Sequence, residues 1–141
     1  MARVDFYVLE RVDERARLVL ACRLAEKAYR LDNRVYVHTQ NRADAEHLDE
    51  LLWTFRDGSF VPHALLGDAD MAASPIMIGS DTDSVTPCDL LINLCDEIPE
   101  FAASFPRVAE IVTKDDRCRT LSRKRFAAYR DDGHTIETHK L

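Results

Sequence analysis

The sequence has few glycines, and none lies where a nucleotide-binding fold needs one. The four glycines among 141 residues are scattered, at Gly58, Gly67, Gly79 and Gly133. The turn after the first expected strand reads Glu10-Arg11-Val12-Asp13, without the glycine-rich loop that lets a backbone approach a pyrophosphate. A phosphate-binding loop of the form G-x-x-x-x-G-K-[ST] is also missing. We therefore expect no nucleotide cofactor.

The cysteines lack the spacing of a metal or redox site. They are Cys22, Cys88, Cys95 and Cys118, with no C-x-x-C pair among them. Each lies in or beside an apolar stretch, which is typical of small buried side chains in a reducing compartment. The five histidines are too far apart to complete a zinc site, and nothing in the spacing pairs a cysteine with His63 as nucleophile and base. We expect no metal, no catalytic residue and no enzymatic activity of the chain itself.

Long apolar runs are absent as well. No run approaches the roughly 18–20 residues that cross a bilayer, and the first five residues carry charges where a signal peptide would be apolar. A chain of this length, with 46% hydrophobic and 31% charged residues, can bury a core without a disulfide or a metal. We expect a single domain over residues 1–141, located in the cytoplasm and not bound to a membrane.

Strand and helix patterns alternate along the chain. The expected strands are residues 3–9, 34–39, 76–78, 89–94, 108–112 and 134–139, and the expected helices are 13–31, 41–55, 98–105 and 115–130. Residues 56–73 are the least regular part, and 81–87 have the composition of a loop. This alternation predicts parallel strands joined by crossovers. The fold class is α/β in three layers: a mostly parallel open sheet with helices on both faces, Rossmann-like but without a nucleotide site.

Charge is distributed unevenly along the chain. The formal net charge is −6, which argues against a protein that coats DNA with its whole surface. Between Arg117 and Arg130, however, there are six basic residues and no acidic one. The expected last helix is therefore a basic segment on an acidic body.

The expected last helix has one unusual face. At about 100° per residue, Arg119, Arg123, Phe126 and Arg130 share an arc of about 60°. The opposite side, which should pack on the sheet, carries Cys118, Leu121, Ala128 and Tyr129.

A phenylalanine among three arginines permits three interpretations. The face is a solvated basic surface with Phe126 folded against a loop, or a pocket for an acidic peptide with an apolar anchor. The third interpretation is a direct single-stranded DNA site, with arginines on phosphates and Phe126 stacked on a base. One helix on an acidic body would give that site weak, salt-sensitive affinity.

Several segments resemble one protein family, the chi subunit of bacterial DNA polymerase III. They are Val4–Leu9 (VDFYVL), Leu48–Trp53 (LDELLW), Ser59–His63 (SFVPH), Asp89–Leu94 (DLLINL) and Arg123–Arg130 (RKRFAAYR). They span nearly the whole chain in the family's order, and the segment SFVPH is the most specific. The resemblance implies a mostly parallel α/β fold without a catalytic site. It also implies an accessory role at the clamp-loader end of the replicase, in the bacterial cytoplasm near the nucleoid.

The resemblance further implies two protein partners: the psi subunit of the clamp-loader complex, and the acidic C-terminal tail of single-stranded DNA-binding protein, which ends in an apolar residue. Arg119 and Arg123 would hold the tail's acidic groups, while Val112 and Phe126 would line its apolar pocket. Phe126 replaces a tyrosine frequent in the family, and Ala127 follows where a lysine can occur. Arg130 or Lys124 is expected to compensate for the lost charge.

A second candidate surface is implied by the same resemblance. Trp53, Phe60 and Pro62 look like the family's aromatic patch for psi, although aromatic residues near a helix end also serve as core. His63 is expected to be a structural histidine. The chain is expected to be a monomer that forms a heterodimer with psi and reaches DNA only indirectly.

Overall fold

The protein forms one seven-stranded parallel sheet. The computed structural model describes residues 2–55, 62–65, 74–80 and 85–141. The strands are Arg3–Val8 (β1), Val35–His38 (β2), His63–Leu65 (β3), Ile76–Gly79 (β4), Leu90–Asn93 (β5), Arg107–Val112 (β6) and Thr135–Lys140 (β7). Their order in the sheet is β3-β4-β2-β5-β6-β1-β7, and every recorded pairing is parallel.

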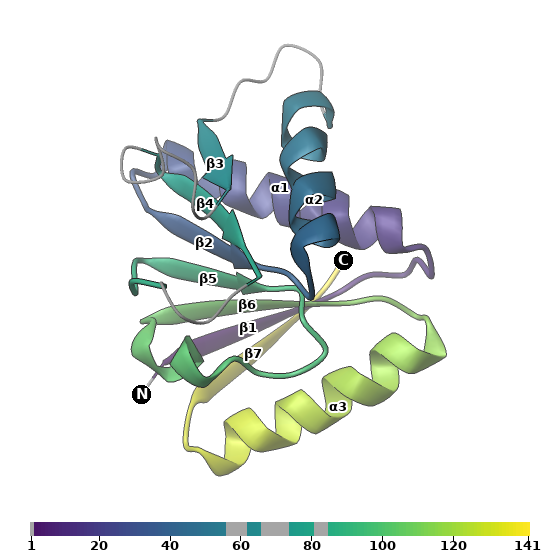
Figure 1. Ribbon diagram of the computed structural model, residues 1–141. Helices are drawn as coiled ribbons and strands as arrows, with labels where there is room; N and C mark the ends of the chain where they lie inside the picture. Colours follow the sequence, from purple (N-terminus) through teal and green to yellow (C-terminus); the bar gives the residue numbers. More distant parts are fainter. Residues whose placement is uncertain (1, 56–61, 66–73, 81–84) are drawn as a thin grey trace.

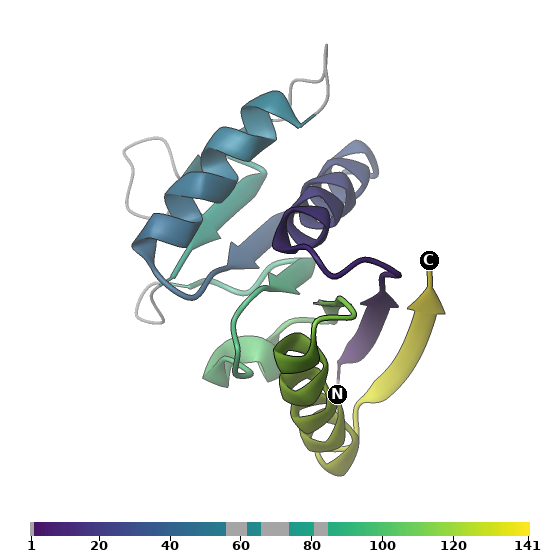
Figure 2. The same ribbon diagram turned by 90° about the vertical axis from the view of Figure 1, so that its right-hand side faces the viewer.

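Helices cover both faces of this sheet. The helices are Glu14–Arg30 (α1), Arg42–Thr54 (α2) and Asp116–Asp131 (α3), with a short 3-10 helix at Glu100–Ser104 (η2). Helices α1 and α2 lie on one face, and α3 lies on the other with η2 (Figure 1; Figure 2). The predicted three-layer α/β fold is confirmed.

The helices begin where side-chain caps satisfy their free backbone amides. Asp13 accepts a hydrogen bond from the amide of Ala16 at 3.2 Å, and Asn41 accepts one from the amide of Asp44 at 2.9 Å. Such caps stabilise a helix start by about 1 kcal/mol each. Both helices therefore begin where the sequence predicted.

Alternation along the strands divides the core into two layers. In β6, Ala109 and Ile111 belong to the apolar cluster under α1 and α2, whereas Val108 and Val112 belong to the cluster under α3. Since successive side chains of a strand point to opposite faces, a central strand needs apolar residues at nearly every position. This explains the continuous apolar runs in the sequence.

The structure corrects two details of the sequence prediction. A short strand, β3, lies inside the stretch that was expected to be irregular. The short helix expected at residues 98–105 is a 3-10 helix of five residues. The loop expected at residues 81–87 lies partly outside the described residues. No helix in the described ranges is long and apolar enough to span a membrane.

Candidate protein-binding surface on helix α3

Helix α3 follows β6 and precedes β7 in the chain, and both of its ends are well defined. The Asp115 side chain accepts a hydrogen bond from the amide of Cys118 at 3.0 Å. After the helix, Gly133 adopts a φ of 83°, a left-handed conformation that glycine adopts without steric cost. These ends agree with the helix predicted over residues 115–130.

The inner face of α3 is polar at its centre. Arg125 is 5% exposed, and its Nε donates to Oε1 of Glu110 on β6 at 3.0 Å; Glu110 is fully buried. The hydroxyl of Tyr129 donates to Oε2 of Glu110 at 2.7 Å, and the side-chain amide of Asn93 donates to the same atom at 2.9 Å. Arg125 also donates to the hydroxyl of Ser122 at 3.0 Å. We call this set the Glu110 network.

The Glu110 network satisfies charges that would otherwise be costly to bury. An unpaired buried charge costs several kcal/mol, and full hydrogen bonding is what makes a buried pair tolerable. Burial raises the pKa of Tyr129 far above its usual range, and the adjacent Glu110 carboxylate raises it further. Tyr129 therefore stays neutral and donates its proton. The network fixes the position and rotation of α3 on the sheet.

The outer face of α3 carries the predicted cluster. Arg119, Arg123, Phe126 and Arg130 are all exposed. Arg119 and Arg123 have no ion-pair partner in the described part of the chain, and Arg130 meets the neighbouring Asp131 at 3.5 Å. We call these four residues the α3 basic surface. The expected shared, exposed face is confirmed.

Phe126 is held in place without being sealed in the core. Its ring is 36% exposed and lies 5.3 Å from the ring of Phe6 on β1, at an interplanar angle of 57°. The ring of Phe6 also contacts Tyr129 at 6.0 Å. Val112 is 8% exposed at the end of β6 and belongs to the same apolar cluster as Phe6. Val112 is therefore nearly buried and contributes little exposed area to the α3 basic surface.

The inner face of α3 was predicted only in part. Tyr129 is buried and Cys118 partly buried, as expected, but the prediction was wrong for Ala128, which is exposed. Ser122 and Arg125 take the buried positions instead. The sequence signal that could have indicated this is Glu110, a carboxylate inside an apolar strand, which requires a buried cationic partner.

The aromatic residues of the second candidate surface lie at the other edge of the sheet. Trp53 lies in the last turn of α2 and is 51% exposed, with its ring 4.7 Å from the ring of His63. The His63 side chain is fully buried, and its Nε2 lies 3.1 Å from the backbone oxygen of Asp49, which fits a structural histidine. Pro62 is partly exposed beside it. Phe60 lies outside the described residues.

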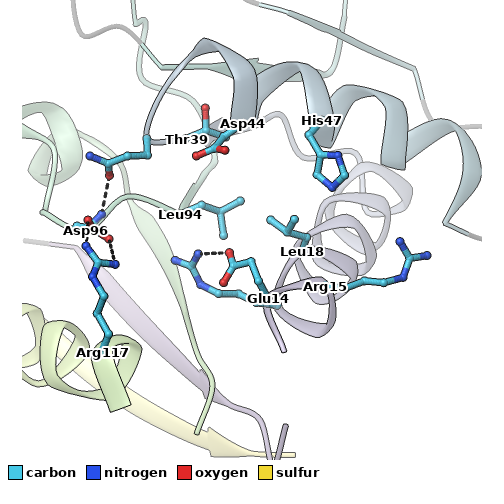
Figure 3. Close-up of a pocket in the computed structure, with 11 residues that line it drawn as sticks. Glu14, Arg15, Leu18, Thr39, Asp44, His47, Leu94, Asp96 and Arg117 are labelled. Carbon is cyan, nitrogen blue, oxygen red and sulfur yellow. Dashed lines mark hydrogen bonds and ion pairs between the residues drawn. The ribbon is translucent and has the colours of Figure 1, made fainter. Parts of the chain in front are cut away.

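A wide hollow lies at the carboxyl edge of the sheet, where open α/β folds bind nucleotides. It has a volume of about 730 Å³. Figure 3 labels nine of its lining residues, which are Glu14, Arg15, Leu18, Thr39, Asp44, His47, Leu94, Asp96 and Arg117.

Carboxylates make this hollow unfavourable for a phosphate group. Glu14 and Asp44 occupy the first turns of α1 and α2, where a phosphate would need open backbone amides. Arg117 is already engaged by Asp96, at 2.7 and 3.3 Å (Figure 3). The residues of this hollow do not fit a dinucleotide.

Sequence comparison matches the whole fold to one family. The family model of the DNA polymerase III chi subunit matches residues 1–137. The chain belongs to this family. A chi subunit from Pseudomonas aeruginosa is 43% identical over 141 residues, covering 100% of this chain and 98% of the relative.

Two further chi subunits are similar along most of the chain. The relative from Haemophilus influenzae is 36% identical over 123 residues, covering 86% of this chain and 85% of the relative. The relative from Escherichia coli is 33% identical over 120 residues, covering 84% and 82%. The resemblance to chi noted in the sequence is confirmed.

Proposed function

We propose that this chi-family protein is a non-catalytic replisome adaptor. Through psi it joins the clamp-loader complex, and through the α3 basic surface it binds the acidic C-terminal tail of single-stranded DNA-binding protein. The observation that carries the proposal is a partly exposed Phe126 ring on the same face of α3 as Arg119 and Arg123, whose charges no described carboxylate neutralises. Family membership supports the same assignment.

The chemistry of the α3 basic surface fits an acidic chain end. A guanidinium group binds a carboxylate through two parallel hydrogen bonds, and such charge-assisted bonds are about twice as strong as neutral ones. The Phe126 ring provides an apolar platform for the last side chain of the tail. Because the Glu110 network fixes α3, these groups are positioned before the ligand arrives, which lowers the entropy cost of binding.

A single arginine substitution tests the tail site. Arg123→Ala is expected to weaken binding of a tail peptide by about 1.5–3 kcal/mol, the range for a lost charged hydrogen bond, or roughly 10- to 150-fold in Kd. Isothermal titration calorimetry measures this effect. The matched control is Lys124→Ala, which removes a neighbouring exposed positive charge outside the α3 basic surface. Equal affinity of the Arg123→Ala variant and the unmodified protein would refute the proposal.

The psi partner is assigned to the opposite edge of the sheet. The half-exposed Trp53 ring beside His63 supports this assignment, since exposed tryptophans are enriched among residues that dominate interface energies. The two surfaces lie at β3 and β7, the two ends of the strand order. The protein can therefore hold both partners at once.

A pair of neighbouring substitutions tests the psi surface. Trp53→Ala is expected to weaken psi binding by about 2 kcal/mol or more and to leave tail binding unchanged. Thr54→Ala, at the adjacent exposed position, serves as the control. Co-purification with psi and calorimetry of the complex report the result. Undiminished psi binding by the Trp53→Ala variant would remove Trp53 from the interface.

In this function the single-stranded DNA-binding protein contacts the DNA, and the chi-family protein does not. The chain alone is therefore expected not to shift a single-stranded oligonucleotide in a gel at physiological salt. A stable shift that disappears in the Arg123→Ala variant would instead support a direct single-stranded DNA site on α3.

A further inference from the structure

The sheet face that carries α1 is covered unevenly. Helix α1 packs on β2, β5 and β6, and β1 and β7 extend past it at the end of the sheet (Figure 2). Among the described residues, no helix lies over β1 and β7 on the side of the sheet that carries α1. Two hollows lie along the side of α1 that faces β1, with lining residues from α1, from β1 and from Leu141 after β7, and we call the two together the groove.

Two hollows follow one another along this groove. One, of about 270 Å³, includes Tyr7 and Leu24 in its lining. The other, of about 390 Å³, includes Leu9, Leu20 and Leu141. Tyr7 and Leu9 point to the same face of one strand, and Leu20 and Leu24 lie one helical turn apart. The hollows are therefore successive parts of a single groove.

The floor of the groove is ordered by contacts between β1 and β7. The ring of Tyr7 stacks on the ring of His139 at 4.9 Å, with an interplanar angle of 18°. The Nε2 atom of His139 lies 2.9 Å from Oδ1 of the buried Asp5. The amide of Leu141 donates to the backbone oxygen of Val8 at 3.0 Å, which places Leu141 beside Leu9. The floor is thus formed before any ligand binds.

The acidic side chains that line the groove are already neutralised or engaged. Asp5 receives hydrogen bonds from Arg3 and Arg107 in addition to its contact with His139. Asp13 caps α1, and Asp89 accepts a hydrogen bond from the amide of Arg34 at 2.8 Å. Asp5 and Asp13 thus have cationic partners, and Asp89 is the one lining carboxylate of these two hollows without a described cationic partner.

Three cations on the α1 side of the groove are not neutralised. Arg15, Arg23 and Lys27 are exposed, and none has an ion-pair partner among the described residues. Arg23 and Lys27 lie one helical turn apart and Arg15 lies eight residues before Arg23, so the three follow α1 from its first turn toward its end and each one borders a hollow of the groove. Arg15 and Arg23 line the larger hollow, and Lys27 lines the smaller one.

We infer that this groove binds an acidic amphipathic segment of a partner protein. Leucine side chains of the segment would enter the apolar floor, and its carboxylates would meet the cations of α1. A leucine-lined floor favours a peptide over a nucleic acid, because bases require flat aromatic platforms and Tyr7 is already stacked on His139. The groove lies on the opposite side of the sheet from α3, so it is separate from the proposed tail site.

A designed peptide tests the groove directly. The probe is a fluorescein-labelled helix of 16 residues with leucines along one face and glutamates elsewhere, compared with a permuted peptide of the same composition. Anisotropy titrations use the protein with Arg119→Glu and Arg123→Glu, so that the α3 basic surface cannot contribute. We expect the amphipathic peptide to bind at least tenfold more tightly than the permuted one.

Reversing the charge of two groove residues provides a second test of the inference. Adding Arg23→Glu and Lys27→Glu to that background is expected to weaken binding at least tenfold, while the thermal midpoint stays within a few degrees because both side chains are exposed. The control is Lys124→Glu in the same background, with no effect expected. Equal binding of the two peptides, or affinity unchanged by the groove substitutions, would overturn the inference. Binding of a poly-dT oligonucleotide that these substitutions abolish would reassign the groove to nucleic acid.

Discussion

Arg123 and Arg125 lie two positions apart on α3, yet their surroundings differ completely. The Arg125 side chain is 5% exposed and bonded to Glu110, whereas Arg123 is exposed and has no described carboxylate partner. One arginine holds the helix on the sheet, and the other remains free for a ligand. The same residue type therefore serves stability on one face and, in the proposed function, recognition on the other.

This difference separates stability from binding on a single helix. Changes in the Glu110 network should lower the free energy of unfolding, whereas changes on the α3 basic surface should lower tail affinity at little cost in stability. A buried charge that loses its partner is expensive, whereas an exposed one is solvated by water. The predictions below test that separation, beginning with the largest expected effect.

Removing the buried carboxylate should cause the largest loss. Glu110→Ala leaves the guanidinium of Arg125 buried without a counter-charge and is expected to lower the free energy of unfolding by about 3–5 kcal/mol. Urea denaturation monitored by circular dichroism measures this change. Replacing both partners, with Glu110→Leu and Arg125→Met, should recover most of the loss. A Glu110→Ala variant as stable as the unmodified protein would contradict the role assigned to the network.

On the outer face, the aromatic ring should matter more for binding than for folding. Phe126→Ala is expected to reduce tail-peptide affinity by about 2 kcal/mol, roughly 30-fold. Its effect on the free energy of unfolding should stay below about 1.5 kcal/mol, because only one face of the ring packs on Phe6. Calorimetry and urea denaturation give the two values. Val12→Ala, at another exposed apolar position, should change neither.

The hydroxyl of Tyr129 makes the stability that the Glu110 network contributes depend on pH. Tyr129→Phe should lower the free energy of unfolding by about 1–2 kcal/mol through its lost hydrogen bond. Burial, and after it the charge of Glu110, raises the pKa of Tyr129 in the folded protein. Its contribution is therefore complete below the unfolded tyrosine pKa of about 10 and is lost as pH rises above that value. The variant should show a shallower decline in stability between about pH 10 and 11, and an identical decline would contradict this prediction.

The smallest effect is expected at the exposed ion pair near the start of α3. The hydrogen bond from Arg117 lowers the pKa of Asp96. Because the Arg117 side chain is 71% exposed, Arg117→Ala should lower the free energy of unfolding by no more than about 1 kcal/mol. A proton NMR titration should show the pKa of Asp96 rising in the variant. An unchanged titration would mean that the pair does not persist in solution.

Much of the fold could be predicted from local patterns. The strands that form β1, β2, β4, β5, β6 and β7 and the starts of all three long helices follow from apolar runs and capping residues. Strand β3 was missed because three residues between proline and glycine provide too little pattern. The short helix near Phe101 was expected, but its 3-10 geometry depends on how Phe101 and Phe105 pack against Tyr36.

The candidate site was predicted on its outer face and only in part on its inner one. Helical periodicity alone places Arg119, Arg123, Phe126 and Arg130 together, because it requires only the pitch of the helix. The sequence prediction named Ala128 as core, which is wrong, and it did not name Ser122 or Arg125, which are buried. A charged side chain is buried when another element supplies its counter-charge, and a helical pattern contains no information about β6.

The sequence by itself therefore determined the order of elements, the parallel α/β class and the exposed basic face of the last helix. Membership in the chi family also follows from sequence comparison. The tertiary structure alone decided which arginine is buried, how far Phe126 is exposed and where α1 leaves the sheet uncovered. Periodicity and capping act within one segment, whereas charge burial and packing depend on residues that are distant in the chain and meet only when the sheet is assembled.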